Sequence, residues 1–168
     1  NSARKQELLA EHGLAYWIEF DNQCVLFDTG QGFVLPHNAE RLRVDLSRAN
    51  SIVLSHGHYD HTGGLLHAFN LAPQSRVFLH PQAMIQRFSG AKEKAREIGM
   101  PSTIRQALQK EEVRLNWTQK PTQVIPGVFV TGEIPRLTDY EDTGGEFYLD
   151  VGGQTPDPIL DDQAIFMD

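Results

Sequence analysis

The fold of this chain is decided by the segment Ser55-His56-Gly57-His58-Tyr59-Asp60-His61-Thr62-Gly63-Gly64, residues 55–64. It follows the apolar run 51–54, whose composition is typical of a strand buried on both faces. The apolar residues at 65, 66 and 69 have the spacing of a helix. Histidines and an aspartate therefore stand at the end of a buried strand, where α/β proteins commonly place their functional sites.

Four side chains within six residues carry atoms that bind metals: His56, His58, Asp60 and His61. A chance match to these positions has a frequency on the order of 10⁻³. His56 and His58 are two apart on extended backbone and therefore project to the same side. Imidazole and carboxylate suit zinc, and also iron or manganese. The alternative is a surface turn that merely picks up metal, but the buried strand before the motif argues against it.

The number of these side chains favours two ions sharing the site. A catalytic zinc usually takes three protein ligands and a water molecule, so four ligands exceed what one ion needs. The economical interpretation places His56 and His58 on one ion, and Asp60 and His61 on the other. Two such ions can hold a hydroxide between them and stabilise an oxyanion.

The rest of the chain predicts alternating strands and helices, hence an α/β fold without a linker. We expect a hairpin over 14–27 with its turn at Asp21-Asn22-Gln23, a buried strand at 76–79, and an exposed excursion over 89–100. A loop or short helix is expected at 2–12, and helices at 34–42 and from Pro101-Ser102 to about 109. Further short strands are expected at 113–116, 123–125, 128–131, 146–151 and 164–167.

Outside the motif, three side chains are weaker site candidates. Asp28 follows an apolar strand, where an aspartate often serves only turn chemistry or a helix cap. His80 ends the strand 76–79, although His-Pro is also a plain strand terminator. Asp162 and its neighbour Asp161 flank a β run and could reach the site, but paired carboxylates are more often solvated or turn-forming. His12 is expected only to end the first segment.

Composition excludes several classes of function. The chain has 168 residues and a formal net charge of −7, which makes a nucleic-acid backbone an unfavourable partner. Its one cysteine, Cys24, cannot form an internal disulfide. No apolar run has the roughly 18–20 residues of a transmembrane helix. We therefore expect a soluble cytoplasmic protein that acts on a small molecule, without a membrane partner and compatible with a homo-oligomer.

The motif, continued by Leu65, resembles the signature of the metallo-β-lactamase superfamily, and Leu26-Phe27-Asp28-Thr29-Gly30 resembles its upstream aspartate motif. More narrowly, residues 9–166 resemble a subfamily labelled 7,8-dihydropterin-6-methyl-4-(β-D-ribofuranosyl)aminobenzene-5′-phosphate synthase. The stretches that carry this second resemblance are Glu11-His12-Gly13-Leu14, Thr131-Gly132-Glu133-Ile134-Pro135-Arg136 and Asp161-Asp162-Gln163-Ala164-Ile165-Phe166.

The resemblance implies an αββα sandwich with metals at one edge, between two sheets. It places His56 and His58 on a first Zn²⁺, Asp60 and His61 on a second, and Asp28 beside them, holding the ligand loop. It also implies further histidine ligands after the Asp161–Phe166 stretch, and none follows before Asp168. We therefore expect residues 1–168 to be a single domain that lacks its C-terminal part, from a whole of very roughly 250 residues.

Three functions follow from these patterns. The first is a metallo-hydrolase in which a metal-bound hydroxide, steered by Asp60 as the catalytic residue, attacks an ester-like or phosphoester substrate. The second, suggested by the subfamily, is a transferase that condenses a pterin with an aminobenzene ribotide. The third is an inactive metal-binding fragment.

Overall fold

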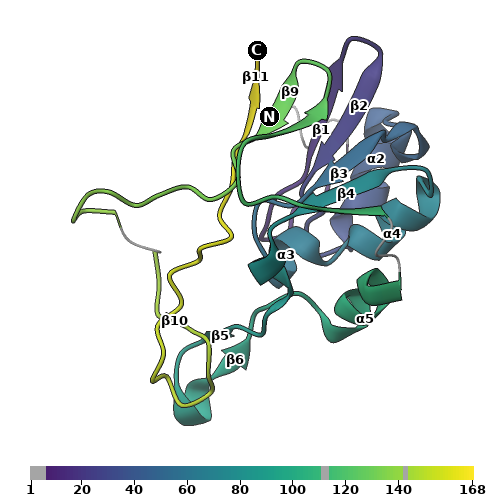
Figure 1. The fold of residues 1–168 in the computed structure, drawn as a ribbon. Helices are drawn as coiled ribbons and strands as arrows, with labels where there is room; N and C mark the ends of the chain where they lie inside the picture. The colour runs from purple at the N-terminus through teal and green to yellow at the C-terminus, as the bar shows by residue number, and fades with distance from the viewer. Residues whose placement is uncertain (1–6, 111–113, 142–143) are drawn as a thin grey trace.

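The computed structural model describes residues 7–110, 114–141 and 144–168 (Figure 1). Its main sheet has five strands in the order β1-β2-β3-β4-β7. The strands are β1 (Tyr16–Phe20), β2 (Gln23–Phe27), β3 (Ser51–Val53), β4 (Arg76–Leu79) and β7 (Leu115–Trp117). β1 and β2 form the expected antiparallel hairpin, and β2, β3, β4 and β7 are parallel neighbours. Asp21 and Asn22 adopt φ values of 45° and 63°, as a two-residue hairpin turn requires.

The helices follow the strands of the main sheet, as the alternating pattern predicts. They are α2 (Val34–Leu42), α3 (Tyr59–Thr62), α4 (Leu65–Leu71) and α5 (Ser102–Lys110), with 3₁₀ turns η1 (Leu46–Arg48), η2 (Pro81–Met84) and η3 (Lys92–Lys94). Across the described ranges, no helix is long and apolar enough to cross a membrane.

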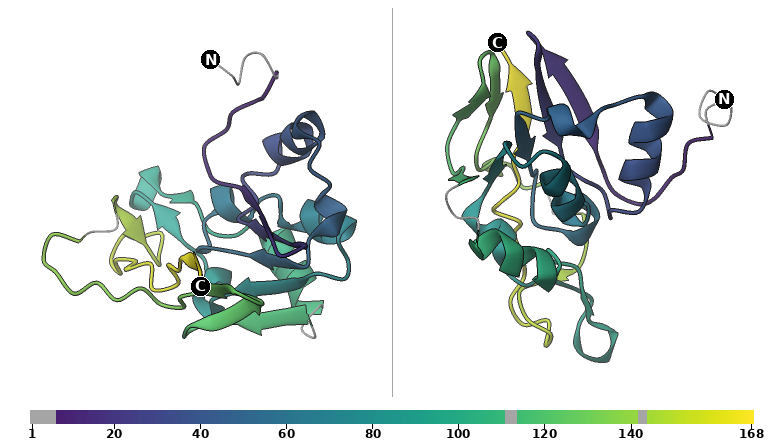
Figure 2. Two further views of the ribbon diagram at one scale, coloured as in Figure 1. Left: turned by 90° about the horizontal axis from the view of Figure 1, so that it is seen from above. Right: turned by 90° about the vertical axis from the view of Figure 1, so that its right-hand side faces the viewer.

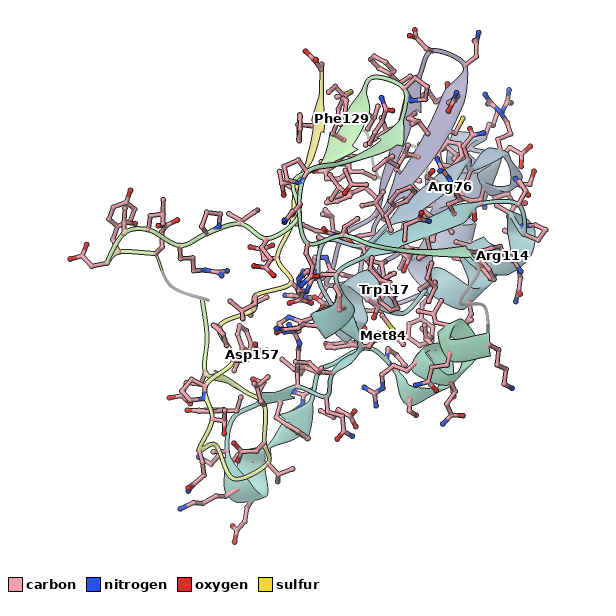
Figure 3. All side chains as sticks on the ribbon, in the orientation of Figure 1. Arg76, Met84, Arg114, Trp117, Phe129 and Asp157 are labelled. Carbon is pink, nitrogen blue, oxygen red and sulfur yellow. The ribbon has the colours of Figure 1, made fainter. Side chains whose placement is uncertain are left out.

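A second sheet covers the other face of the main sheet. Its strands β8 (Thr122–Ile125), β9 (Val128–Val130) and β11 (Ile165–Met167) stand in the order β11-β9-β8. Alternation along β2 separates the two cores: Leu26 packs toward the helices, whereas Val25 and Phe27 pack against the second sheet. The result is a helix layer followed by two sheets (Figure 2). On the outer face of the second sheet, the rings of Phe129 and Phe166 stack with centroids 5.4 Å apart (Figure 3).

A third, small sheet extends below the main body in Figure 1. Its strands β5 (Phe88–Ser89), β6 (Arg96–Glu97) and β10 (Phe147–Tyr148) stand in the order β10-β5-β6. Residues 89–98 are exposed or half-buried, as expected of this excursion, but they take part in two short strands that the sequence did not predict. Strands of two residues are too short to show a period of two, and the third strand lies far along the chain, so no local pattern could reveal the sheet.

Other strand boundaries differ from the sequence expectations. The strand expected at 146–151 is only β10, and the last one begins at Ile165 rather than Ala164. The strand expected at 113–116 is β7, and its predicted first residue lies outside the described residues. Residues 2–6 of the first predicted segment also lie outside them.

Candidate metal centre

The motif forms a tight loop after β3 and continues through α3. Leu54 donates its N–H to the Phe78 carbonyl, which keeps the chain extended as it leaves the sheet. His58 then begins α3 with an extended backbone. Between the first two histidines, Gly57 lies against the backbone of η2: a Cβ there would stand 2.3 Å from the Ala83 carbonyl oxygen. Only glycine permits this approach, which the loop needs to turn at that point.

The loop brings three imidazoles together. The ring of His56 lies 4.5 Å from that of His58 and 4.2 Å from that of His61, between centroids. Asp60 joins them, with its Oδ2 3.8 Å from His61 Nε2. The residues that the sequence selected as metal ligands thus lie side by side.

Asp28 organises this loop from beneath. It is fully buried at the end of β2, in a left-handed conformation (φ 59°) that aspartate tolerates better than most residues. Its Oδ1 accepts the Ser55 N–H at 2.7 Å, and its Oδ2 accepts the Ser55 hydroxyl at 2.7 Å. The same Oδ2 lies 2.7 Å from His61 Nδ1. Asp28 therefore has the supporting position that the resemblance implies.

These contacts indicate which ring nitrogens carry protons. A carboxylate accepts only, so His61 Nδ1 donates to Asp28. The Ser55 hydroxyl also gives its proton to Asp28 and so accepts at 2.9 Å from His56 Nδ1. With both Nδ1 atoms protonated, the lone pairs of His56 and His61 are on Nε2. His58 Nε2 is buried and has no hydrogen-bond partner among the described residues.

Burial keeps two of the histidines neutral. Burial, together with the neighbouring His61 and His58, lowers the pKa of His56 to about 2. Burial also lowers the pKa of His58, and the Arg87 guanidinium lowers it further. Burial would lower the pKa of His61 as well, but the hydrogen bond and the charge of Asp28 raise it above its usual value. A neutral imidazole is the form that binds a metal ion.

A buried ion cluster supports the loop from the C-terminal side. Arg87 is fully buried, with Nη2 2.6 Å from Asp161 Oδ1 and Nη1 3.4 Å from Asp157 Oδ2. The other oxygen of Asp161 accepts the Gly57 N–H at 2.7 Å. Figure 3 shows Asp157 on the segment that runs from β10 towards β11. No sequence pattern indicated a role for Arg87, and for Asp161 the pattern favoured a solvated or turn-forming carboxylate.

His12 makes a contact that the sequence did not predict. Its Nδ1 lies 2.8 Å from Asp60 Oδ2, although its own side chain is largely exposed. Gly13 enables this contact: its φ is 126°, and a Cβ there would stand 2.0 Å from the Asp60 carbonyl oxygen. His12 thus lies at the edge of the site rather than merely ending a segment.

The structure places the two weakest candidates, His80 and Asp162, in different surroundings. His80 is buried, and its nitrogens contact Glu133 Oε1 at 3.0 Å and the Gln82 N–H at 3.2 Å, which is a structural arrangement. Asp162 lies nearer the motif. Burial raises its pKa, Arg136 lowers it, and the neighbouring carboxylates of Asp161 and Asp28 raise it. Its Oδ2 is 3.4 Å from Arg136 Nη2.

The donor set fits divalent metal ions that prefer nitrogen and oxygen ligands. Its favourable features are the Nε2 of His58, which has no hydrogen-bond partner among the described residues, the Nε2 lone pairs of His56 and His61, and the adjacent carboxylate of Asp60. Within 7–110, 114–141 and 144–168, no group of three or more His, Cys, Asp or Glu side chains is placed so that it could hold a metal ion as it stands. The residues thus form a set of gathered donors rather than a closed coordination shell.

Comparison with known proteins identifies relatives over most of the chain. The profile of the metallo-beta-lactamase superfamily matches residues 9–158. An uncharacterized protein of Methanocaldococcus jannaschii, MJ0448, is 32% identical over 98% of this chain and 62% of its own length. A protein of the same organism named 7,8-dihydropterin-6-methyl-4-(beta-D-ribofuranosyl)-aminobenzene-5'-phosphate synthase is 29% identical over 74% of this chain and 45% of its own length. This chain therefore spans less than two thirds of either relative.

Solved structures similar to this one include metallo-beta-lactamases. The Rm3 enzyme has a TM-score of 0.48 and 19% identity, over 70% of this chain and 43% of its own. MEM-A1, a subclass B3 enzyme isolated from a soil metagenome library, has a TM-score of 0.46 and 19% identity, over 70% and 44% of the two chains.

Proposed function

Because the chain belongs to the metallo-β-lactamase superfamily, we propose that it is part of a metal-dependent hydrolase acting on an ester-like or phosphoester small molecule. The observation that carries the proposal is the gathering of three imidazoles with nitrogens left for a metal. Asp28 and Ser55 leave the Nε2 atoms of His56 and His61 unprotonated, and the buried Nε2 of His58 has no hydrogen-bond partner among the described residues. Zinc fits these ligands best, with iron or manganese as alternatives.

In this proposal each residue of the motif has a defined task. His56 and His58 hold one ion, and Asp60 and His61 hold a second. Bound metal ions of this kind polarise a substrate and lower the pKa of a water molecule. Asp28 fixes the His61 ring through Nδ1, and Asp60, which is buried and in contact with His12, orients the attacking water.

Metal removal tests the proposal directly. We expect the protein to bind about two equivalents of metal and to hydrolyse bis(4-nitrophenyl) phosphate or 4-nitrophenyl acetate. Chelation should abolish the activity, and Zn²⁺, Mn²⁺ or Fe²⁺ should restore it. Metal content by mass spectrometry and release of nitrophenol provide the two readouts. Hydrolysis that survives complete removal of metal would contradict the proposal.

Asp28→Asn tests the supporting role of that carboxylate. Asp28 accepts hydrogen bonds with both oxygens, whereas asparagine has a single acceptor oxygen. Either the Ser55 N–H or the Ser55 hydroxyl and His61 Nδ1 then face an amide NH₂ group, which weakens the support of the ligand loop. We expect metal affinity to fall about 10- to 100-fold, measured by competition with a chromophoric chelator. Asp45→Asn, on an exposed carboxylate that caps η1, should leave the affinity unchanged. Equal affinities in the two variants would remove Asp28 from the site.

The relative named as a synthase supports a second candidate, a transferase that joins a pterin to an aminobenzene ribotide. The two functions differ in their products. Incubation with both substrates, followed by mass spectrometry, should detect a condensed product if the transferase interpretation is right. Hydrolysis without incorporation of the pterin would eliminate it.

A further inference from the structure

A cavity of about 220 Å³ lies between the motif and the small sheet. It is smaller than the roughly 300–1,000 Å³ of pockets for drug-sized ligands, so only a small molecule would fit. One wall belongs to the candidate metal site and the other to the small sheet. The residues used below are His12, His58 and Asp60 on the first wall, and Ser89, Arg96 and Phe147 on the second.

The second wall is a single row of side chains across three strands. Ser89 on β5 pairs with Arg96 on β6 and with Phe147 on β10. Directly paired residues in antiparallel strands project to the same face of a sheet. The row therefore presents a guanidinium, a hydroxyl and an aromatic ring to the cavity. Phe147 closes the gap to the site, with its ring centroid 5.1 Å from that of His58.

Backbone hydrogen bonds hold the row beside the motif. Tyr59 donates its N–H to the Ile98 carbonyl at 2.9 Å, and Ile98 donates to the Arg87 carbonyl at 2.8 Å. On the other edge, Gly90 donates to the Glu146 carbonyl at 3.1 Å, which secures β10. The row is thus tied to the loop that carries the histidines.

Arg96 provides a positive charge that no described side chain neutralises. Its neighbour Glu97 pairs with Arg105 at 3.3 Å, and no hydrogen bond or ion pair joins the Arg96 guanidinium to the part of the chain that the structure describes. Across the cavity, the Asp60 carboxylate already contacts His12. An acidic ligand group would therefore bind at the Arg96 end, where Ser89 adds a hydroxyl.

We propose that this row is a substrate-recognition subsite for a small aromatic molecule that carries a phosphate or similar acidic group. Arg96 and Ser89 bind the acidic group, since a charged guanidinium forms strong hydrogen bonds to such oxygens. Phe147 packs against the planar ring. The inference rests on the proposed function, because it makes the cavity the place where the substrate meets the metal site.

Binding of phenylphosphonate, which is not hydrolysed, tests the subsite in metal-free protein by calorimetry. We expect saturable binding that Arg96→Ala weakens about tenfold or more. Arg96→Lys keeps the charge, so its affinity for phenylphosphonate should lie between those of the unsubstituted protein and Arg96→Ala. Lys94→Ala removes the same charge from an exposed position on the same loop and should change nothing. Thermal unfolding verifies that each variant is folded.

Methylphosphonate carries the acidic group without the aromatic ring, so it tests the contribution of the ring to binding. Phe147→Leu should weaken the binding of phenylphosphonate about threefold to tenfold and leave the binding of methylphosphonate unchanged. The inference is overturned if phenylphosphonate does not bind, if Arg96→Ala and Lys94→Ala behave alike, or if the two phosphonates respond equally to Phe147→Leu. Arg96-dependent binding in a protein without hydrolytic activity would overturn the proposed function alone. Hydrolysis with normal binding in Arg96→Ala would overturn the subsite alone.

Discussion

His58→Ala is expected to remove at least one of the two metal equivalents and to lower hydrolytic activity by at least about 100-fold. Substitutions of residues that only support a ligand already cost about 10- to 100-fold, so loss of a ligand should cost more. His58 is the histidine whose buried Nε2 lacks a partner among the described residues, and its neutral form is favoured by burial and by Arg87. Metal content after gel filtration and the rate on bis(4-nitrophenyl) phosphate measure both effects.

His67→Ala is the matched control for this variant. His67 lies on α4, directly after the motif, and is exposed. The His67→Ala variant should retain the metal content and the hydrolysis rate of the unsubstituted protein. If His58→Ala retained both as well, the assignment of the metal site would be wrong.

The second large effect is expected at Arg87, on stability. Arg87→Met would leave the buried carboxylates of Asp157 and Asp161 without their counter-charge. Breaking a buried ion pair in this way costs about 3–5 kcal/mol of the free energy of unfolding. Urea denaturation measures the loss. Arg48→Ala, which breaks the exposed pair with Glu19, should cost less than about 1 kcal/mol.

A combined variant separates lost charge from lost packing. Arg87→Met together with Asp157→Asn and Asp161→Asn leaves no unpaired charge in this cluster, so it should be more stable than Arg87→Met alone. If the combined variant were less stable than Arg87→Met, unpaired charge would not be the cause of the loss.

The elements that local chemistry determines could be predicted from the sequence. The turn at Asp21-Asn22 joins the predicted hairpin, and the helix at 34–42 has the predicted limits. The motif also follows a buried strand, as the apolar run 51–54 predicts. In each case the residues that decide the structure are close neighbours in the chain.

The parts that depend on distant contacts could not be predicted. Nothing near Arg87 in the sequence indicates a buried cation, because its charge partners lie 70 and 74 positions later. The row of Ser89, Arg96 and Phe147 exists only through strand pairing between segments that show no local pattern. His12 has its contact with Asp60 because of the backbone conformation of Gly13.

The hydrogen bond from Gly57 to Asp161 has a consequence for how the protein is made. Its two residues are 104 positions apart, so the loop carrying the histidines emerges from the ribosome long before its buried carboxylate partner. Contacts of such long range are formed late and slow folding. A nascent chain would therefore expose the histidines on an incompletely held loop, and metal capture at the finished site would follow folding rather than guide it.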